Sequence, residues 1–455
     1  MNSEDPTHTE APSGSAPTTT TVAVVGAGLA GLTAARALHR AGVDVLVLEA
    51  ADRLGGRAMS ETTALGSRVD LGGQWIGHDH HRLAALATEF GATRFRMHTT
   101  PVPTILDGAR RVLPGAPSTL ATVGLLLSLE VLSHIHPRRR WDTTTVADWL
   151  AKVPGRTPRR LLELAALISW TADLDRLSVQ TMMTLIRLQG GLRTMLSTTG
   201  GAQEDLLVEG VGTLVDGLAD ELGPRVRLGH RVTSIGEGAD GVTLATTAGT
   251  VHATKVVVTV PPPLLDRISF QPSLPPDRVA AATRTYMGSV YKAIAVFDRP
   301  FWRDRGKNAE IVVLDAPRIA VFDTSPPDGP GHLCMLVGGP HARALDQLDA
   351  ASRRETILGP LVSWLGTEVL EPVSWHEKAW HLDDNVGGGY FAVPEPGATD
   401  ALMPLPFTPV GEIHWAGTET AVDHPGYLDG AIESGTRVAH EVLDALAQRD
   451  QLTPR

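Results

Sequence analysis

The stretch TVAVVGAGLAGLTAARALHRAGVDVLVLEA, residues 21–50, decides the fold of this chain. An apolar strand from Val22 to Val25 runs into a glycine turn, which opens a helix that reaches about Arg40 and is stopped by Gly42. A second apolar strand follows from Val43 to Leu48. Strands that are apolar throughout are buried on both faces, so this βαβ unit predicts a parallel α/β sheet covered by helices.

The glycine turn has the spacing of a dinucleotide-binding motif, with Gly26, Gly28 and Gly31 between the strand and the helix. These glycines allow a tight turn and a close approach of the backbone to a pyrophosphate at the positive helix N-terminus. Glu49 ends the second strand, where its carboxylate can accept hydrogen bonds from both ribose hydroxyls and would repel a 2′-phosphate. The unit therefore predicts a dinucleotide other than NADP.

The composition limits the classes of function. At 455 residues the chain is long enough for two or three cores. Its net charge of −11 argues against nucleic acid as a partner, because phosphate binding requires clustered basic residues. The basic cluster from Pro137 to Arg140 is interpreted as a solvated loop. A single cysteine, Cys334, excludes an intrachain disulfide and gives no sign of an oxidising compartment, so we expect a cytoplasmic protein.

No membrane partner is expected from the hydropathy of the sequence. The most apolar stretch, LATVGLLLSLEVL from Leu120 to Leu132, is shorter than the roughly 20 residues that a membrane-spanning helix needs, and it contains Glu130. The first 20 residues are rich in Thr, Ser, Pro and acidic residues and lack the order of a signal peptide, so residues 1–20 are expected to be a disordered leader.

The remaining chain alternates in character. Helical patterns dominate from about residue 82 to 203, strands and turns follow, a mixed segment comes next, and the end reads as strand, glycine turn and helix. We therefore expect two interleaved domains. One is a nucleotide-binding domain built from residues 21–81, 204–281 and 383–450. The other is an α+β domain built from residues 82–203 and 282–382.

Further motifs carry a family resemblance. Arg53-Leu-Gly-Gly-Arg57 continues from the second strand, Asp70-Leu-Gly-Gly-Gln-Trp-Ile-Gly77 follows it, and WAGTETA and GYLDGAIESGTRVA lie near the C-terminus. This ordered set, spanning Val22 to about Leu446, resembles the flavin-containing amine oxidases, the superfamily of monoamine and polyamine oxidases. The resemblance implies their two-domain fold, in which a Rossmann-like (GR2-type) FAD-binding domain is interleaved with an α+β substrate-binding domain.

The resemblance also implies which residues contact FAD, with Arg57 as the cation for its diphosphate. They are Gly26, Gly28, Leu29, Ala30, Gly31, Glu49, Ala50, Arg57, Gly72, Gly73, Gln74, Trp75, Val232, Trp380, Thr418, Glu419, Gly426 and Leu428. Ala51 stands where some relatives carry a phosphate-binding arginine. Covalent members carry cysteine immediately before a tyrosine of the site, and here that residue is Gly389. We therefore expect FAD to be bound noncovalently.

Lys292 lies in the middle of the apolar stretch GSVYKAIAVF, residues 288–297, and is one of only five lysines in the chain. Burying an ammonium group is costly and lowers its pKa, so it requires an acceptor or a chemical task. The resemblance implies that Lys292 holds a water beside flavin N5. The alternative is a lysine that extends from the strand end to the surface.

Tyr390 and Tyr427 are two of the four tyrosines. By resemblance they form an aromatic cage in front of the flavin, whose negative ring faces orient an amine; the alternative is that both are core aromatics. Ser197-Thr-Thr-Gly-Gly-Ala-Gln203 resembles a cavity segment of the family, which would place Gln203 and Leu196 at the substrate cavity.

These features predict an oxidase that converts an amine to an imine, which water hydrolyses, and reduces O2 to hydrogen peroxide. A homodimer is one possible assembly. Three alternatives stay open: an L-amino-acid oxidase, with Arg187 or Arg193 to hold the carboxylate; a flavin oxidase or desaturase acting on a larger natural product; and a non-enzymatic flavin-fold interaction module. The run from His78 to His81 cannot easily converge on one ion, so no metal site is predicted.

Overall fold

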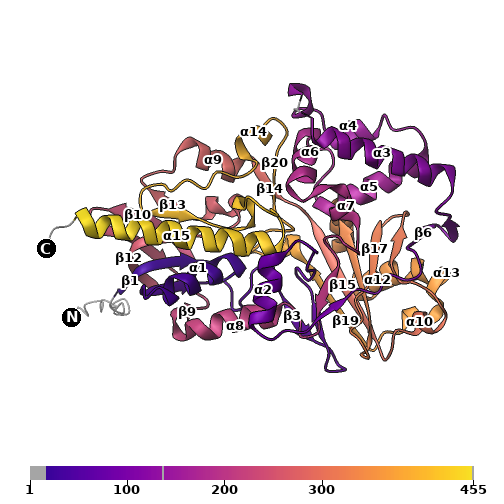
Figure 1. Cartoon of the computed structure of the whole chain (residues 1–455), viewed down its shortest axis with the longest axis horizontal. Helices are drawn as coiled ribbons and strands as arrows, with labels where there is room; N and C mark the ends of the chain where they lie inside the picture. The colour runs from indigo at the N-terminus through magenta and orange to yellow at the C-terminus, as the bar shows by residue number, and fades with distance from the viewer. Residues whose placement is uncertain (1–16, 136–137, 453–455) are drawn as a thin grey trace, which may run out of the picture.

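The computed structural model describes residues 17–135 and 138–452. Figure 1 shows two halves. One half contains the first helix, α1 (Leu29–Arg40), and the last, α15 (Leu428–Leu452), which lie side by side. The other half contains a group of helices above a separate sheet. Segments that are distant in sequence therefore meet at the middle of the molecule, where the site described below lies.

The sheet of the first half confirms the predicted βαβ unit. In spatial order its strands are β13 (Ser269–Gln271), β10 (Val232–Gly238), β11 (Gly241–Thr246), β12 (Gly249–Val258), β1 (Thr18–Val25), β2 (Val45–Leu48) and β9 (Val226–Arg227), and β21 (Ile413–Trp415) pairs with β12. β1 is parallel to both β2 and β12, whereas β10, β11 and β12 are joined as antiparallel hairpins. The sheet is thus a mixed one with a parallel centre.

The central strands are buried on both faces, as their apolar sequences predict. Val22 and Val24 pack in one core with α1, α15 and α8 (Gly212–Leu222), whereas Ala23 and Val25 pack in another core with residues of β10 to β12. Successive side chains of a strand point to opposite faces, so each central strand contributes to both cores.

The first strand begins earlier than expected. Order was predicted from Thr21, but β1 begins at Thr18, and Thr18 to Thr20 pair with Val251 to Ala253 of β12. Threonine is β-branched and fits a strand, and the long β12 supplies the hydrogen-bonding partner that the local sequence does not reveal. Residues 1–16 of the predicted leader lie outside the described residues.

The second half contains the other large sheet. Its spatial order is β19 (Ser374–Ala379), β15 (Val290–Phe297), β18 (Gly331–Gly338), β17 (Ile319–Asp323), β16 (Ile311–Val313), β6 (Thr104–Asp107) and β7 (Arg110–Val112). β15 and β18 are buried along their whole length, and Lys292 lies in β15. Strands β6 and β7 come from a segment that reads as helical in the sequence, because they are short and gain their pairing only at the edge of this sheet.

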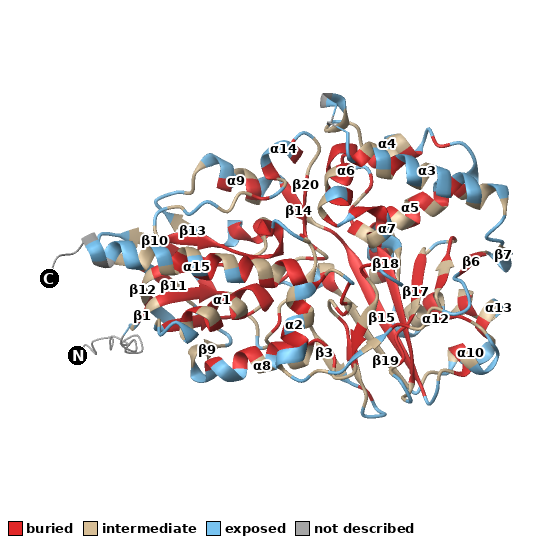
Figure 2. Cartoon of the chain, in the orientation of Figure 1, coloured by how far each residue is buried: buried red, intermediate tan, exposed pale blue. Residues whose placement is uncertain are grey.

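A group of helices lies above this sheet: α3 (Pro117–Ser133), α4 (Val146–Leu150), α5 (Arg156–Trp170), α6 (Val179–Leu188) and α7 (Gly191–Leu196). They share one core with Tyr286 and Phe391. Figure 2 shows their inner faces buried and much of the outer face of α3 exposed. α5 ends at Trp170, because Thr171 takes a left-handed conformation with φ 55°.

The remaining elements are β3 (Ser60–Thr62), β4 (Arg68–Asp70), α2 (His81–Glu89), β5 (Arg94–Arg96), β8 (Asp205–Leu207), α9 (Pro276–Thr283), β14 (Thr285–Met287), α10 (Phe301–Asp304), α11 (Pro340–Ala344), α12 (Ala350–Leu358), α13 (Val362–Leu365), β20 (Ala392–Pro394) and α14 (Thr399–Leu402). α2 lies beyond the boundary expected at residue 81, yet Leu83 and Leu86 pack in the core of the first sheet. The domain boundaries themselves stay predictions. Within the described chain, every helix is too short or too polar to cross a bilayer.

Candidate active site

A cavity of about 530 Å³ lies where the two halves meet. Of the residues predicted from the sequence to form a site, those that line it are Gly26, Gly28, Leu29, Ala30, Glu49, Ala50, Arg57, Gly72, Gly73, Gln74, Trp75, Leu196, Gln203, Val232, Lys292, Trp380, Tyr390, Thr418, Gly426, Tyr427 and Leu428. Gly31 and Glu419 do not line it. Residues from both sheets and from several loops are thus brought to one space, and the two exceptions have identifiable structural roles.

The N-terminus of α1 faces this cavity and suits an anion. Gly28 is the N-cap residue, and within the described chain the helix has neither a side-chain cap nor an acidic residue in its first turn. The first N–H groups of a helix have no partner within it, so a diphosphate fits here. Gly31 does not line the cavity but is required for the tight turn, since a Cβ at this residue would lie 2.0 Å from the carbonyl oxygen of Gly26.

Glu49 is held in a fixed position beside the cavity. One carboxylate oxygen accepts a hydrogen bond from the backbone N–H of Ala27 at 2.7 Å, and the other accepts from Ala51 at 2.8 Å. Each oxygen keeps a further lone pair. The side chain is only 8% exposed and remains able to accept from ribose hydroxyls, as the sequence predicts.

Arg57 is engaged more fully than the sequence suggests. Its guanidinium donates to both carboxylate oxygens of Glu419, at 2.6 and 3.1 Å, and to the carbonyl oxygen of Tyr390 at 2.8 Å. Burial is the largest single influence on Glu419 and raises its pKa, but the charge of Arg57 and the hydrogen bonds from Arg57 and from backbone N–H groups together outweigh it, so the pKa of Glu419 lies below its ordinary value. Arg57 therefore anchors the backbone at Tyr390, and contact with a diphosphate stays a prediction for its remaining N–H groups.

Lys292 is 3% exposed, and its ammonium has two acceptors from the segment after Asp70. Nζ donates to the carbonyl oxygen of Gly72 at 2.8 Å and to Oε1 of Gln74 at 2.6 Å. Nζ also lies 5.4 Å from the ring centroid of Trp75. Burial lowers the pKa of Lys292, with the charges of Cys334 and Asp70 acting in the opposite direction. The lysine does not extend to the surface, and it is anchored on the wall of the cavity.

The aromatic residues near Lys292 also contribute to the cavity wall. Trp380 donates its indole N–H to the carbonyl oxygen of Leu71 at 2.8 Å. The indole nitrogen of Trp75 is buried and has no hydrogen-bond partner among the described residues. The single thiol, Cys334, lies 3.7 Å from Nε2 of Gln74 and does not line the cavity. An apolar wall with an unpartnered donor fits a flat aromatic ring system that carries acceptors.

Tyr390 is placed by a glycine-rich crossing of two segments. The N–H of Gly389 donates to the carbonyl oxygen of Gly288 at 2.9 Å, and the hydroxyl of Thr171 donates to the carbonyl oxygen of Gly389. A Cβ at Gly288 would lie 2.5 Å from that same carbonyl, so only glycine permits the approach. Burial raises the pKa of Tyr390, with smaller contributions from Cys334 and Tyr427, and the phenol stays neutral.

The backbone of Tyr427 is held in place by hydrogen bonds within its own loop. Its carbonyl oxygen accepts a hydrogen bond from the hydroxyl of Thr418 at 2.9 Å, and that hydroxyl in turn accepts from the N–H of Gly426 at 2.8 Å. The ring of His80 lies against the phenol, with 4.8 Å between ring centroids. Burial raises the pKa of Tyr427, with a further contribution from Asp79.

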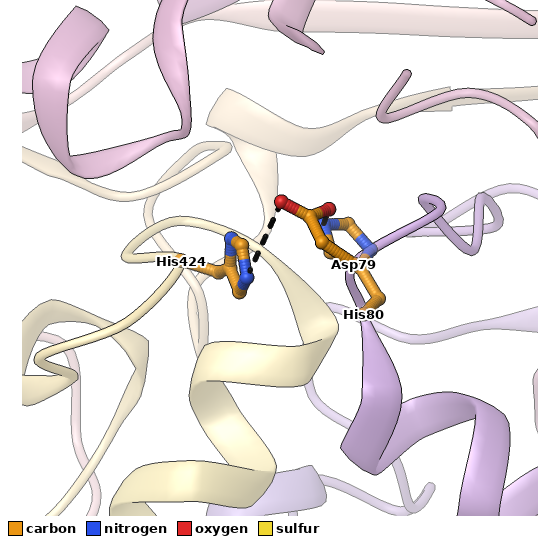
Figure 3. Close-up of side chains that lie close together, drawn as sticks. All are labelled: Asp79, His80 and His424. Carbon is orange, nitrogen blue, oxygen red and sulfur yellow. Dashed lines mark ion pairs between the residues drawn. The ribbon is translucent and has the colours of Figure 1, made fainter. Parts of the chain in front are cut away.

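Asp79, His80 and His424 form a cluster beside Tyr427 (Figure 3). Their ligand atoms lie within 4.8 Å of one another, which could suggest a metal site. However, Nδ1 of His80 accepts a hydrogen bond from the N–H of Gly77 at 2.9 Å. A neutral His80 therefore carries its proton on Nε2, so that atom has no lone pair for a metal. Burial and the neighbouring His424 lower the pKa of His80 to about 4, so it is neutral at pH 7.

The cavity also contains a residue that sequence reasoning missed. Glu310 lies on its lining, in the loop before β16, and burial raises its pKa to about 7. Nothing in the local sequence distinguishes this acid from a surface residue. In contrast, Arg187 and Arg193, the predicted candidates for holding a carboxylate, are exposed and do not line the cavity.

Comparison with known proteins decides the family. The model of the family described as flavin containing amine oxidoreductase matches residues 29–443. The chain belongs to this family. AofH of Mycobacterium tuberculosis, described as a flavin-containing monoamine oxidase, is 35% identical over 94% of this chain and 98% of its own length.

Two solved structures of the same family have the same fold. Cyclohexylamine oxidase from Brevibacterium oxydans superposes with a TM-score of 0.90 at 27% identity, over 94% of this chain and 99% of that one. Putrescine oxidase bound to putrescine superposes with a TM-score of 0.86 at 27% identity, over 94% of this chain and 100% of that one. The chain is therefore an FAD-dependent amine oxidoreductase with the predicted fold of that family.

Proposed function

We propose that the enzyme oxidises a small amine held between Tyr390 and Tyr427, with FAD bound noncovalently and Lys292 beside its reactive edge. The observation that carries this proposal is the shared cavity wall: a buried ammonium and two neutral phenols, supplied by distant parts of the chain, face one space. When bound, FAD would supply the redox chemistry: it would take a hydride equivalent, that is two electrons with one proton, from the amine and pass the two electrons to O2.

The two phenols orient the amine. Aromatic rings present negative potential on their faces, and because burial keeps both hydroxyls un-ionised the rings act through these faces and not as charged bases. Among the described lining residues there is no histidine, so the amine is expected to react after it has lost its proton. Gly426 and Thr418 hold Tyr427, and Arg57 holds the backbone of Tyr390, which keeps both rings in place without substrate.

Lys292 supplies a fixed positive charge in a site shielded from solvent. Its two acceptors, Gly72 and Gln74, lie in a segment that itself lines the cavity, so the ammonium cannot move independently of the wall. Such a preorganised donor can orient a water molecule or stabilise negative charge that develops during oxygen reduction. The absence of a thiol next to Tyr390, where the chain has Gly389, supports the noncovalent mode of binding.

The cavity lining supports an amine with an apolar body. Leu126, Leu164 and Ile168 from the helical group lie on the lining, together with Phe322 from β17. Glu310 adds one carboxyl group on the wall formed by the second sheet. A diamine, whose second ammonium could pair with Glu310, is therefore a second candidate class of substrate.

An amino-acid oxidase is less well supported. The lining arginines are Arg53, Arg57, Arg231 and Arg267, and each already binds residues around the cofactor region, such as Asp383 and Asn385. Within the described lining, the helical group contributes no guanidinium that could pair with a substrate carboxylate. A cytoplasmic location and a homodimer stay predictions.

The test is peroxide release by the flavin-loaded enzyme over a panel of monoamines, diamines and amino acids. Turnover of apolar monoamines or diamines with little turnover of amino acids is expected. Preferential turnover of amino acids, or a protein that binds no flavin, would contradict the proposal.

A further inference from the structure

The outward side of α3 is apolar to a degree that is unusual for a protein surface. Large apolar side chains recur every three or four residues along it. They form the α3 outer face, which consists of Leu120 (61% exposed), Val123 (48%), Leu127 (64%), Val131 (64%) and Ile135 (48%). This spacing places the first four on one side of the helix, and Ile135 follows two residues after the helix ends. Figure 2 shows that side of α3 open to solvent. A contiguous exposed apolar face of this kind marks a binding surface.

The inward side of α3 is already in use, so the helix cannot simply turn its apolar residues inside. Thr122 and Leu126 line the active-site cavity, and Leu129 packs in the core of the helical group. The only charged residue of the 17-residue helix, Glu130, lies seven positions after Val123 and therefore at the border of this face, with its side chain 33% exposed. Its carboxylate accepts a hydrogen bond from the backbone N–H of Leu192 at 2.6 Å. The outer face is therefore apolar except for this one engaged carboxylate at its border, which also lies 3.4 Å from Nε2 of His134.

Basic residues lie at both ends of this face. Arg110 precedes the helix, Arg138 and Arg140 follow it, and all three are exposed. None of the three pairs with a carboxylate in residues 17–135 and 138–452. The nearby carboxylates Asp107 and Asp142 are engaged by an arginine and a threonine. Arg138 does lie over the ring of Trp141, 5.9 Å from its centroid. An apolar face between arginines that have no carboxylate partner among the described residues thus stands out in a chain whose net charge is −11.

We propose that the α3 outer face lies on a membrane surface rich in anionic phospholipid. The apolar side chains enter the boundary of the acyl chains, and the arginines at both ends pair with lipid phosphates, as in helices that lie in the interface. At 17 residues the helix is about 25 Å long, which suits lying in the interface, since no described helix can span a bilayer. This proposal departs from the sequence prediction of no membrane partner, which rested on the lack of a stretch long enough to span a membrane.

A second copy of the chain fits this face less well. A two-fold contact uses the same patch on both subunits, so α3 would pack against its copy. An antiparallel pair would bring Arg110 near Arg138 and Arg140 of the copy, and a parallel pair would bring each arginine near its equivalent. Both arrangements place these like charges together, and the one carboxylate of the helix, Glu130, is already engaged by the N–H of Leu192. An anionic surface removes this repulsion.

The experiment is co-sedimentation of the full-length, flavin-loaded protein with vesicles of phosphatidylcholine alone and with vesicles that also contain phosphatidylglycerol. The unsubstituted protein is expected to bind the second kind and not the first. Leu127→Glu combined with Val131→Glu is expected to weaken binding about tenfold or more, because two apolar anchors are lost. Arg138→Gln combined with Arg140→Gln is expected to weaken binding and to reduce its dependence on salt.

The matched control adds the same two charges elsewhere. Val279→Glu combined with Val373→Glu replaces two valines that are each 45% exposed, and it is expected to leave binding within about twofold. Flavin absorbance and the melting temperature show that each variant is folded. Equal binding to both vesicle types, no binding to either, or equal loss in the control variant would overturn the proposal. A dimer in sedimentation velocity that Leu127→Glu with Val131→Glu dissociates, without vesicle binding, would assign the face to a second copy instead.

Discussion

Replacing Lys292 with methionine removes the buried charge while keeping most of the side-chain volume. Lys292 is 3% exposed and donates to Gly72 and Gln74. The substitution leaves two buried oxygens without this donor, at about 1–3 kcal/mol each. It also removes the cost of burying an ammonium group, which is several kcal/mol. These contributions have opposite signs, so the free energy of unfolding is expected to change by no more than about 2 kcal/mol.

The effect on turnover is expected to be much larger than the effect on stability. Removing one preorganised donor from a site shielded from solvent typically costs about 100-fold or more in rate, which corresponds to about 2.7 kcal/mol. Anaerobic stopped-flow absorbance measures the reduction of the flavin by the amine, and mixing the reduced enzyme with oxygen measures its reoxidation. At least one of these rates should fall about 100-fold, whereas the flavin content should be unchanged.

Lys255→Met is the matched control. Lys255 is also buried, at 7% exposure, but it pairs with Glu412 at the first sheet and does not line the cavity. Its replacement should lower the melting temperature without changing either rate. If Lys292→Met turned over within about twofold of the unsubstituted enzyme, or if both lysine variants slowed equally, the proposed role of Lys292 would be wrong.

Four further predictions concern the same site. Burial raises the pKa of Glu310 to about 7, so its carboxyl gains charge as pH rises through that value. The ratio of kcat/KM for a diamine to kcat/KM for a matched monoamine should therefore rise with pH, and Glu310→Gln should remove this pH dependence. If the ratio did not change with pH in either the unsubstituted enzyme or the variant, pairing of Glu310 with a diamine would be excluded. Tyr390→Phe and Tyr427→Phe should keep kcat/KM within about fivefold, because the ring face and not the hydroxyl orients the amine. Tyr390→Ala and Tyr427→Ala, which remove the ring, should lower kcat/KM about tenfold or more. An equal loss of kcat/KM in the phenylalanine and alanine variants would contradict this. His80→Ala should lower kcat/KM about tenfold, because the ring that supports Tyr427 is lost. His80→Gln, which keeps an acceptor for the N–H of Gly77, should recover part of this kcat/KM. If His80→Ala had the melting temperature and the kcat/KM of the unsubstituted enzyme, the proposed support of Tyr427 by His80 would be wrong. Acid precipitation should leave the yellow colour in the supernatant, and colour in the pellet would show a covalent bond.

Local sequence patterns were sufficient for the elements that carry the cofactor fold. The apolar strand around Val24, the glycine turn and the end of α1 at Arg40 all lie where the pattern places them, because each depends on backbone preferences and burial within a few residues. Patterns failed where an element depends on a distant partner, as for β6, whose four residues pair with a strand that lies about 200 positions further along.

The sequence by itself determined the family, the order of its motifs and the list of residues that could meet at one site. The tertiary structure alone decided which of them are free to act. Arg57 is bound to Glu419, 362 positions away, and Lys292 to Gln74, 218 positions away. His80 lies against Tyr427, and Glu310 faces the cavity. Hydrogen bonding, burial and charge act through space over a few ångströms, and the chain brings these groups together only when both sheets have folded.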